Sequence, residues 1–168
     1  FRSHGDAGQQ LDIRVGGHAI MSERAYYLDE GLPAPVPETD GLSRPYWEGL
    51  QREEIFVQRC DKCQNWQWGP EWICHKCHSF DLTWTKVEGQ GRIYSWERVW
   101  HPVHPALKDQ GPYIVVLVEM PEYGNIRMIG NLLGDPEQDV RIGAEVNAVY
   151  EHHKDNDPPF TLLQWAYS

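Results

Sequence analysis

Four cysteines are the residues of this chain best suited to chemistry, and they form two CxxC pairs. Cys60 and Cys63 make the first pair, Cys74 and Cys77 make the second, and ten residues separate them. Two residues between cysteines allow a tight turn that directs both thiolates at one ion, and a second turn completes a tetrahedron. The spacing therefore predicts a tetrathiolate zinc site in a compact ribbon. Because four protein ligands leave no open coordination position, we expect the metal to be structural.

Other uses of these cysteines remain open. Iron in a rubredoxin-like site needs the same four ligands, and the sequence does not separate it from zinc. His75 or His78 could replace one thiolate. Two disulfides or a redox CxxC fit less well, because we find no secretory signal peptide and a redox pair needs only one CxxC. Free thiols in metal spacing suggest the cytoplasm.

The elements that position the cysteines can be read from the neighbouring residues. Ser43 is a typical N-cap for a helix that ends near Glu54, and this helix carries Tyr46, Trp47 and Leu50 on one face. We expect that face to contact a partner protein. A strand over 55–60 leads into the first pair of cysteines. Alternation at 66–68 and at 80–84 predicts the other strands of the ribbon.

Five further strands follow the cysteines, and they predict a second module. They are expected at Gly89–Trp96, Tyr113–Met120, Asn125–Leu133, Glu145–Tyr150 and Thr161–Trp165, with a hairpin turn at Pro121–Gly124. Five short strands of this kind suit an OB-type barrel. The predicted fold is therefore mainly β, with an N-terminal helix and zinc ribbon over 42–86 and a five-stranded OB-fold barrel over 87–168.

Residues 1–41 form an N-terminal extension. Its first twenty residues are polar and Gly-rich without clear periodicity, so Met21 could be a natural start, or the segment could be the tail of a preceding domain. Alternate prolines in Leu32–Gly41 favour an extended arm that is either a spacer or a strap across a neighbouring surface.

Composition limits the classes of partner. A net charge of −10 argues against a general nucleic-acid binder, whose affinity comes mostly from neutralising phosphates. No apolar run is long enough to cross a membrane, so we expect a soluble protein. Eight Trp and eight Tyr are many for this length, and they must fill cores or meet a partner.

Several short motifs together carry a family resemblance. In addition to the aromatic helix and the paired cysteines, they are Gly91–Trp96, His101–Pro105, Pro112–Tyr113, Leu117–Glu119, Asn131–Leu132 and Ile142–Gly143. Over Leu42 to Trp165 the chain resembles the acyl-CoA-associated family that joins a rubredoxin-like zinc ribbon to an OB-fold. The resemblance implies an auxiliary partner of thiolase-superfamily enzymes: thiolases, thiolase-like acyltransferases or sterol-carrier-type aldolases that shorten steroid side chains. It also implies that the catalytic residues belong to the partner.

The resemblance suggests a set of residues that contact CoA or the partner. Arginines could bind CoA phosphates, tryptophans could stack on adenine, and the His-Pro loop could supply a titratable group. These candidates are Arg92, Trp96, Arg98, Trp100, His101, His104 and Arg127. For the two histidines a rigid loop corner is the alternative, and for Trp96 a core position is. His152 and His153 are expected at an exposed hairpin end.

These observations lead to one functional hypothesis and two alternatives. We expect a non-catalytic subunit that stabilises a thiolase-like enzyme, could help to form its acyl-CoA channel, and assembles with it as a two-plus-two heterotetramer. The first alternative is an OB-fold that binds nucleic acid with an accessory zinc ribbon. The second is a rubredoxin-like electron carrier.

Overall fold

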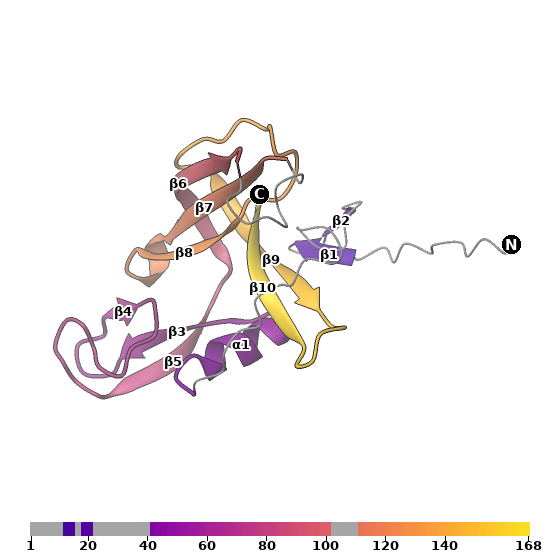
Figure 1. The fold of residues 1–168 in the computed structure, drawn as a ribbon. Coiled ribbons are helices and arrows are strands. Elements are labelled where there is room, and N and C mark those ends of the chain that lie inside the picture. Colours follow the sequence, from indigo (N-terminus) through magenta and orange to yellow (C-terminus); the bar gives the residue numbers. More distant parts are fainter. Residues whose placement is uncertain (1–11, 16–17, 22–40, 102–110) are drawn as a thin grey trace, which may run out of the picture.

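The chain folds into a small zinc-ribbon-like sheet and a β-barrel, with one α-helix between them (Figure 1). The computed structural model describes residues 12–15, 18–21, 41–101 and 111–168. The proline-rich arm and His104 lie outside these residues. Among the described residues, no helix is long and apolar enough to cross a membrane.

The ribbon sheet has three antiparallel strands. Its strands are β3 (Ile55–Cys60), β4 (Trp66–Gln67) and β5 (Leu82–Val87), in the order β4-β3-β5. The strand that leads into the first cysteine pair has the predicted bounds. The ribbon expected from the cysteine spacing is therefore present.

The barrel has five strands in the order β10-β9-β6-β7-β8. They are β6 (Gln90–Val99), β7 (Tyr113–Met120), β8 (Ile126–Asn131), β9 (Glu145–His153) and β10 (Phe160–Tyr167). A parallel bridge between Leu132 and Trp165 joins the two ends of the sheet and nearly closes it. The predicted five-stranded barrel is confirmed, and β7 has the predicted bounds.

Strand β6 carries a β-bulge where it pairs with β7. A bulge at Tyr94 shifts the register, because Ile93 pairs with Val118 whereas Ser95 pairs with Leu117. At Gly91 a Cβ atom would lie 2.5 Å from Val118 Cγ1, so only glycine allows this approach. The glycines expected to permit coiling of this strand thus include one that packing requires.

Helix α1 (Arg44–Gln51) joins the ribbon to the barrel. It is shorter than predicted, and no side-chain hydrogen bond from Ser43 caps it; instead the carbonyl oxygen of Ser43 accepts from the N–H groups of Tyr46 and Trp47. Leu50 is fully buried and Tyr46 is 7% exposed, in a core that runs from β3 into the barrel strands. The helix contacts β3, β9 and β10.

The burial of α1 changes the prediction for its aromatic face. Tyr46 and Leu50 pack inside the chain, so their side chains are not available to a partner; only half-buried Trp47 keeps that possibility. Much of the aromatic surplus is also used here: Tyr46 contacts Trp68 at 4.5 Å between ring centroids, and Trp66 meets Tyr123 at 5.2 Å. The first contact joins the helix to the ribbon, and the second joins the ribbon to the barrel.

Two short strands precede the helix. Strands β1 (Asp12–Val15) and β2 (His18–Met21) pair antiparallel, and β1 lies against β9. The sequence showed no periodicity here, so this hairpin was not predicted.

Candidate metal centre and partner-facing residues

The two cysteine pairs sit on two turns of the same construction. After each pair comes a residue with positive φ, Gln64 at 61° and His78 at 58°. In both turns the N–H of that residue donates to the carbonyl oxygen of the first cysteine, at 2.8 and 2.9 Å. The N–H of the first cysteine in turn donates to the carbonyl oxygen of the residue after the positive-φ position, which is Asn65 in the first turn and Ser79 in the second. Equal turns present the four thiols in a nearly two-fold arrangement.

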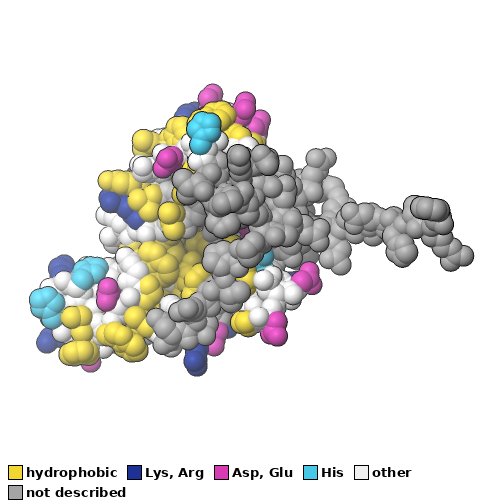
Figure 2. Space-filling view, in the orientation of Figure 1, with side chains coloured by type: hydrophobic (Ala, Val, Ile, Leu, Met, Phe, Trp, Pro, Cys, Tyr) yellow, Lys and Arg dark blue, Asp and Glu magenta, His cyan; other side chains and the backbone are white. Residues whose placement is uncertain are grey.

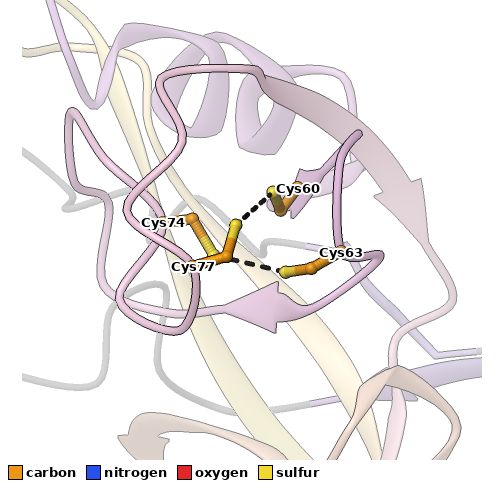
Figure 3. A group of neighbouring side chains, drawn as sticks. All are labelled: Cys60, Cys63, Cys74 and Cys77. Carbon is orange, nitrogen blue, oxygen red and sulfur yellow. Dashed lines mark hydrogen bonds between the residues drawn. The ribbon is translucent and has the colours of Figure 1, made fainter.

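The four sulfur atoms converge on one point (Figure 3). All lie within 4.8 Å of one another, and the Cys60–Cys77 and Cys63–Cys74 sulfurs are each 3.6 Å apart. These separations fit ligands of one tetrahedral ion with metal–sulfur bonds of about 2.3 Å. Cys60 and Cys74 are fully buried. The cluster of described residues that can hold a metal ion consists of the four cysteines without His75 or His78.

Electrostatics in the cluster favour a bound cation. The backbone N–H of Cys77, with that of Lys76, lowers the pKa of Cys74 to about 6. At Cys63 the backbone N–H of Asn65 acts in the same direction, but burial and hydrogen bonds from the other three thiols raise its pKa to about 12. The Cys74 thiolate therefore forms readily, whereas the Cys63 thiol keeps its proton, because burial and the hydrogen bonds among the thiols disfavour its charged form. A divalent cation among them would stabilise all four thiolates.

A buried pair of glutamines holds the second cysteine turn in place. Gln58 and Gln67 face each other on β3 and β4 and are 3% and 1% exposed. Gln67 Nε2 donates to Gln58 Oε1 at 3.1 Å. Together the two amides hydrogen-bond backbone groups of Glu71, Ile73 and His75. Sequence analysis missed this pair, since an alternating strand pattern does not reveal which polar residues are buried.

The arginines proposed for CoA fall into two groups. Arg98 donates to the carbonyl oxygens of Pro136 and Gln138, and its guanidinium lies over the Trp96 and Trp100 rings at 5.4 and 5.8 Å. It therefore supports the loop between β8 and β9. Trp96 is half-buried against the core, and Trp100 is 52% exposed.

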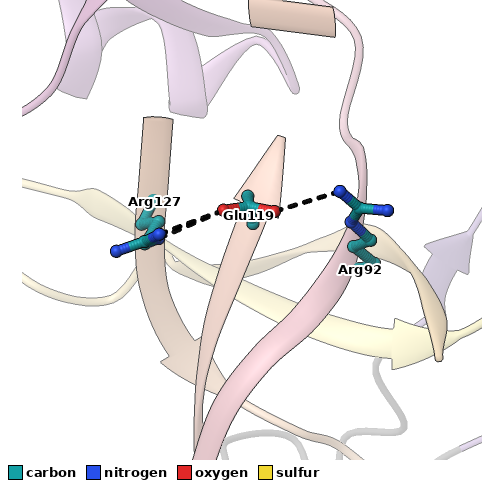
Figure 4. A network of polar contacts seen from close by, with 3 residues as sticks. All are labelled: Arg92, Glu119 and Arg127. Carbon is teal, nitrogen blue, oxygen red and sulfur yellow. Dashed lines mark hydrogen bonds and ion pairs between the residues drawn. The ribbon is translucent and has the colours of Figure 1, made fainter. Parts of the chain in front are cut away.

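Arg92 and Arg127 form a separate group on the outside of the barrel (Figure 4). Both pair with Glu119, which lies between them on β7, at 3.2 Å each. The Arg127 guanidinium also lies 3.5 Å from the Tyr94 ring centroid. Glu119 and Tyr94 were not among the predicted residues; strand register, had it been known, would have placed them beside the arginines.

The histidines show no catalytic grouping within the described residues. His101 is exposed at the end of β6. The expected exposed position of His152 and His153 is wrong: His153 is 6% exposed, contacts Glu151 Oε1 at 2.8 Å and stacks on Phe160, and His152 contacts Thr161 and Glu53. Cross-strand pairing between β9 and β10 buries both side chains wholly or in part.

Family models match both modules. Residues 47–83 match the ChsH2 rubredoxin-like zinc ribbon domain, and residues 84–151 match the ChsH2 C-terminal OB-fold domain. The chain belongs to the ChsH2 (DUF35) family. The resemblance drawn from the helix, ribbon and barrel motifs is thus confirmed.

Relatives of this family differ in length. A DUF35 domain-containing scaffold protein of Methanocaldococcus jannaschii is 30% identical, over 66% of this chain and 77% of its own. A probable enoyl-CoA hydratase alpha subunit of Thermomonospora curvata is 34% identical over 67% of this chain, and the 3-oxo-4,17-pregnadiene-20-carboxyl-CoA hydratase alpha subunit of Mycobacterium tuberculosis is 28% identical over 80%. The chain spans only 34% and 44% of those two proteins.

Solved structures share the fold. A chain of the Ltp2-ChsH2(DUF35) aldolase superposes with a TM-score of 0.65 at 30% identity, over 80% of this chain and 98% of that one. A DUF35-family protein from Sulfolobus solfataricus superposes with a TM-score of 0.51 at 17% identity, over 77% and 87% of the two chains, which shows the fold alone.

Proposed function

We propose that this chain is a non-catalytic auxiliary subunit of an enzyme that processes acyl-CoA thioesters, with a thiolase-like protein as its catalytic partner. The observation that carries the proposal is the superposition on nearly the whole of one chain of the Ltp2-ChsH2(DUF35) aldolase. The partner would be a thiolase, an acyltransferase or an aldolase that acts on steroid side chains.

The variety of the relatives supports an auxiliary role. The proteins similar to this chain include an aldolase, two hydratase alpha subunits and scaffold proteins. Aldol cleavage and hydration need different catalytic groups, whereas a module shared by both enzymes serves binding or assembly more naturally. Within the described residues, the buried Glu151 and the histidines of β9 are engaged in contacts that hold the strands together.

We further propose that the four cysteines hold structural zinc. A complete set of four thiolates on two matching turns leaves no position for substrate, and the ribbon's small sheet needs the metal for its stability. Iron would give a coloured protein, whereas zinc would not, so metal analysis with a visible spectrum distinguishes a structural ribbon from an electron carrier.

The barrel residues would then face the CoA channel or the partner. Arg127 lies exposed on Tyr94, Arg92 lies exposed on the other side of Glu119, and Trp100 and His101 lie exposed just after β6. Trp47 is the one residue of the helix face that keeps surface for a partner. Arg98 and Trp96 act indirectly by supporting the loop. The nucleic-acid alternative gains nothing from this arrangement, since Glu119 partly neutralises the arginine pair on an acidic chain.

Co-expression tests the proposal. The chain is produced with thiolase-like proteins of its own host, and the products are separated by size-exclusion chromatography with mass determination. We expect a stable complex with two copies of each chain that contains one zinc per copy of this chain. A chain that elutes alone beside every such protein would contradict the proposal.

A further inference from the structure

The outer side of β6, β7 and β8 carries apolar residues that stay exposed among the residues the structure describes. Buried and partly exposed residues alternate along β7, so Leu117 and Glu119 point outward while Val116 and Val118 fill the barrel. Leu117 pairs with Ile129 on β8, which is 65% exposed. The bulge in β6 adds Tyr94, which is 43% exposed. Figure 2 shows hydrophobic side chains next to basic ones in this part of the barrel.

We call this surface the open face; it consists of Tyr94, Leu117 and Ile129, with Arg92, Glu119 and Arg127 at one end. The opposite outer surface of the barrel differs. On β9 and β10, Val149, Gln164 and Ala166 also alternate with core residues, yet they are at most 5% exposed. Strand β1 lies against β9 on the chain itself. Within the described part of the chain, the surface over β9 and β10 is therefore buried, whereas the open face stays exposed.

The polar end of the open face is preorganised and net positive. Glu119 is only 12% exposed and fixes Arg92 and Arg127, whose side chains are 50% and 42% exposed. Stacking of Arg127 on Tyr94 adds a second constraint. Each guanidinium has five N–H donors, and one carboxylate between two of them leaves donors for further acceptors. Two arginines against one glutamate make a local positive site on a chain of charge −10.

These features describe a protein-binding surface rather than a small-molecule pocket. A flat sheet face cannot enclose a ligand by itself, whereas exposed Ile and Tyr beside fixed arginines resemble the composition of interface centres. We propose that the open face binds the catalytic subunit, an inference that rests on the proposed function. The matching surface of that subunit would be an apolar patch bordered by carboxylates, which would pair with Arg92 and Arg127.

The tip of the ribbon is the competing surface. Trp72 and Phe80 are 68% and 78% exposed there, and the charges exposed in the same region are mixed: Asp61, Glu71, Asp81, Lys62 and Lys76. No fixed basic pair accompanies these aromatic residues among the described salt bridges. Among the described residues, exposed apolar side chains beside two arginines held by one carboxylate are therefore found on the open face and not at the ribbon tip.

Matched charge substitutions distinguish the two surfaces. Ile129→Glu, Arg127→Glu and, as the control, Phe80→Glu change exposed side chains, so folding should survive; circular dichroism and zinc content verify it. The probe is the co-expressed thiolase-like subunit that forms the complex with the unchanged chain. We expect Ile129→Glu and Arg127→Glu each to raise the dissociation constant of the complex at least tenfold, and Phe80→Glu to change it less than twofold.

The outcomes separate this inference from the proposed function. Unchanged affinity in Ile129→Glu and Arg127→Glu, with a complex still formed by the unchanged chain, would overturn the open face and leave the auxiliary role standing. Loss of affinity for the partner only in Phe80→Glu, or in all three variants, would also overturn it, since binding would then need the ribbon tip. Failure of the unchanged chain itself to bind would instead contradict the proposed function.

Discussion

At the residue scale, the metal ligands could be predicted and their supports could not. The CxxC spacing encodes the turn directly, so four cysteines identify the site from sequence alone. Gln58 and Gln67 are as buried as the core, yet polar residues in a strand give no sign of which neighbours they will bind. The same limit hid Glu119, whose role depends on strand register.

Removal of one ligand should release the metal and unfold the ribbon. We expect Cys60→Ser or Cys77→Ser to lose bound zinc, because the energy of metal binding is also folding energy for so small a sheet. Zinc content and thermal unfolding measure the effect, with Phe80→Ser as a control that leaves all four sulfurs in place. One equivalent of zinc and unchanged thermal stability in both cysteine variants would refute the tetrathiolate site.

Loss of a buried amide should loosen the second cysteine turn. Gln67→Met keeps the side-chain volume but leaves backbone groups of Ile73 and His75 without this partner. We expect a loss of about 1–3 kcal/mol in the free energy of unfolding, the cost of unsatisfied buried groups. Zinc should also pass faster to a chelator. Exposed Gln90→Met is the control, and equal transfer rates in both variants would argue against this supporting role.

At the scale of elements, sequence patterns predicted strands well and packing between elements poorly. Strand β7 has its predicted bounds because it is a nearly continuous apolar run between two prolines, while β9 and β10 extend further than expected. The apolar face of α1 was recognised but assigned to a partner. Periodicity shows that one face of a helix is apolar, but it does not show which surface buries that face. Here the ribbon and the barrel of the same chain bury it.

The helix should couple the two modules. We expect Leu50→Ala to lower the free energy of unfolding by about 2–5 kcal/mol, as for other fully buried leucines, because it opens a cavity between β3 and the barrel. Urea unfolding followed by tryptophan fluorescence measures this, with exposed Glu48→Ala as the control. Equal stability of the two variants would mean that the helix does not join the modules energetically.

At the scale of the whole molecule, composition argued against some classes of partner but did not indicate a function. The charge of −10 spoke against nucleic acid, and family membership followed from motifs and was confirmed. The use of the many aromatic residues could not be read from composition: part of them pack the ribbon against the helix and the barrel, and part, including Tyr94 and Trp72, remain exposed. Only the structure distinguishes aromatic residues that pack inside the chain from those that stay exposed, because both kinds occur in the same strands and turns.

The central claim is that this chain assists catalysis without performing it, and reconstitution tests this most directly. Release of product from an acyl-CoA thioester is measured for the purified thiolase-like partner, for this chain, and for the partner titrated with this chain. We predict no turnover by this chain alone and a rise in partner activity that saturates at one copy per partner protomer. Turnover by this chain alone, or full partner activity that this chain leaves unchanged, would contradict the account.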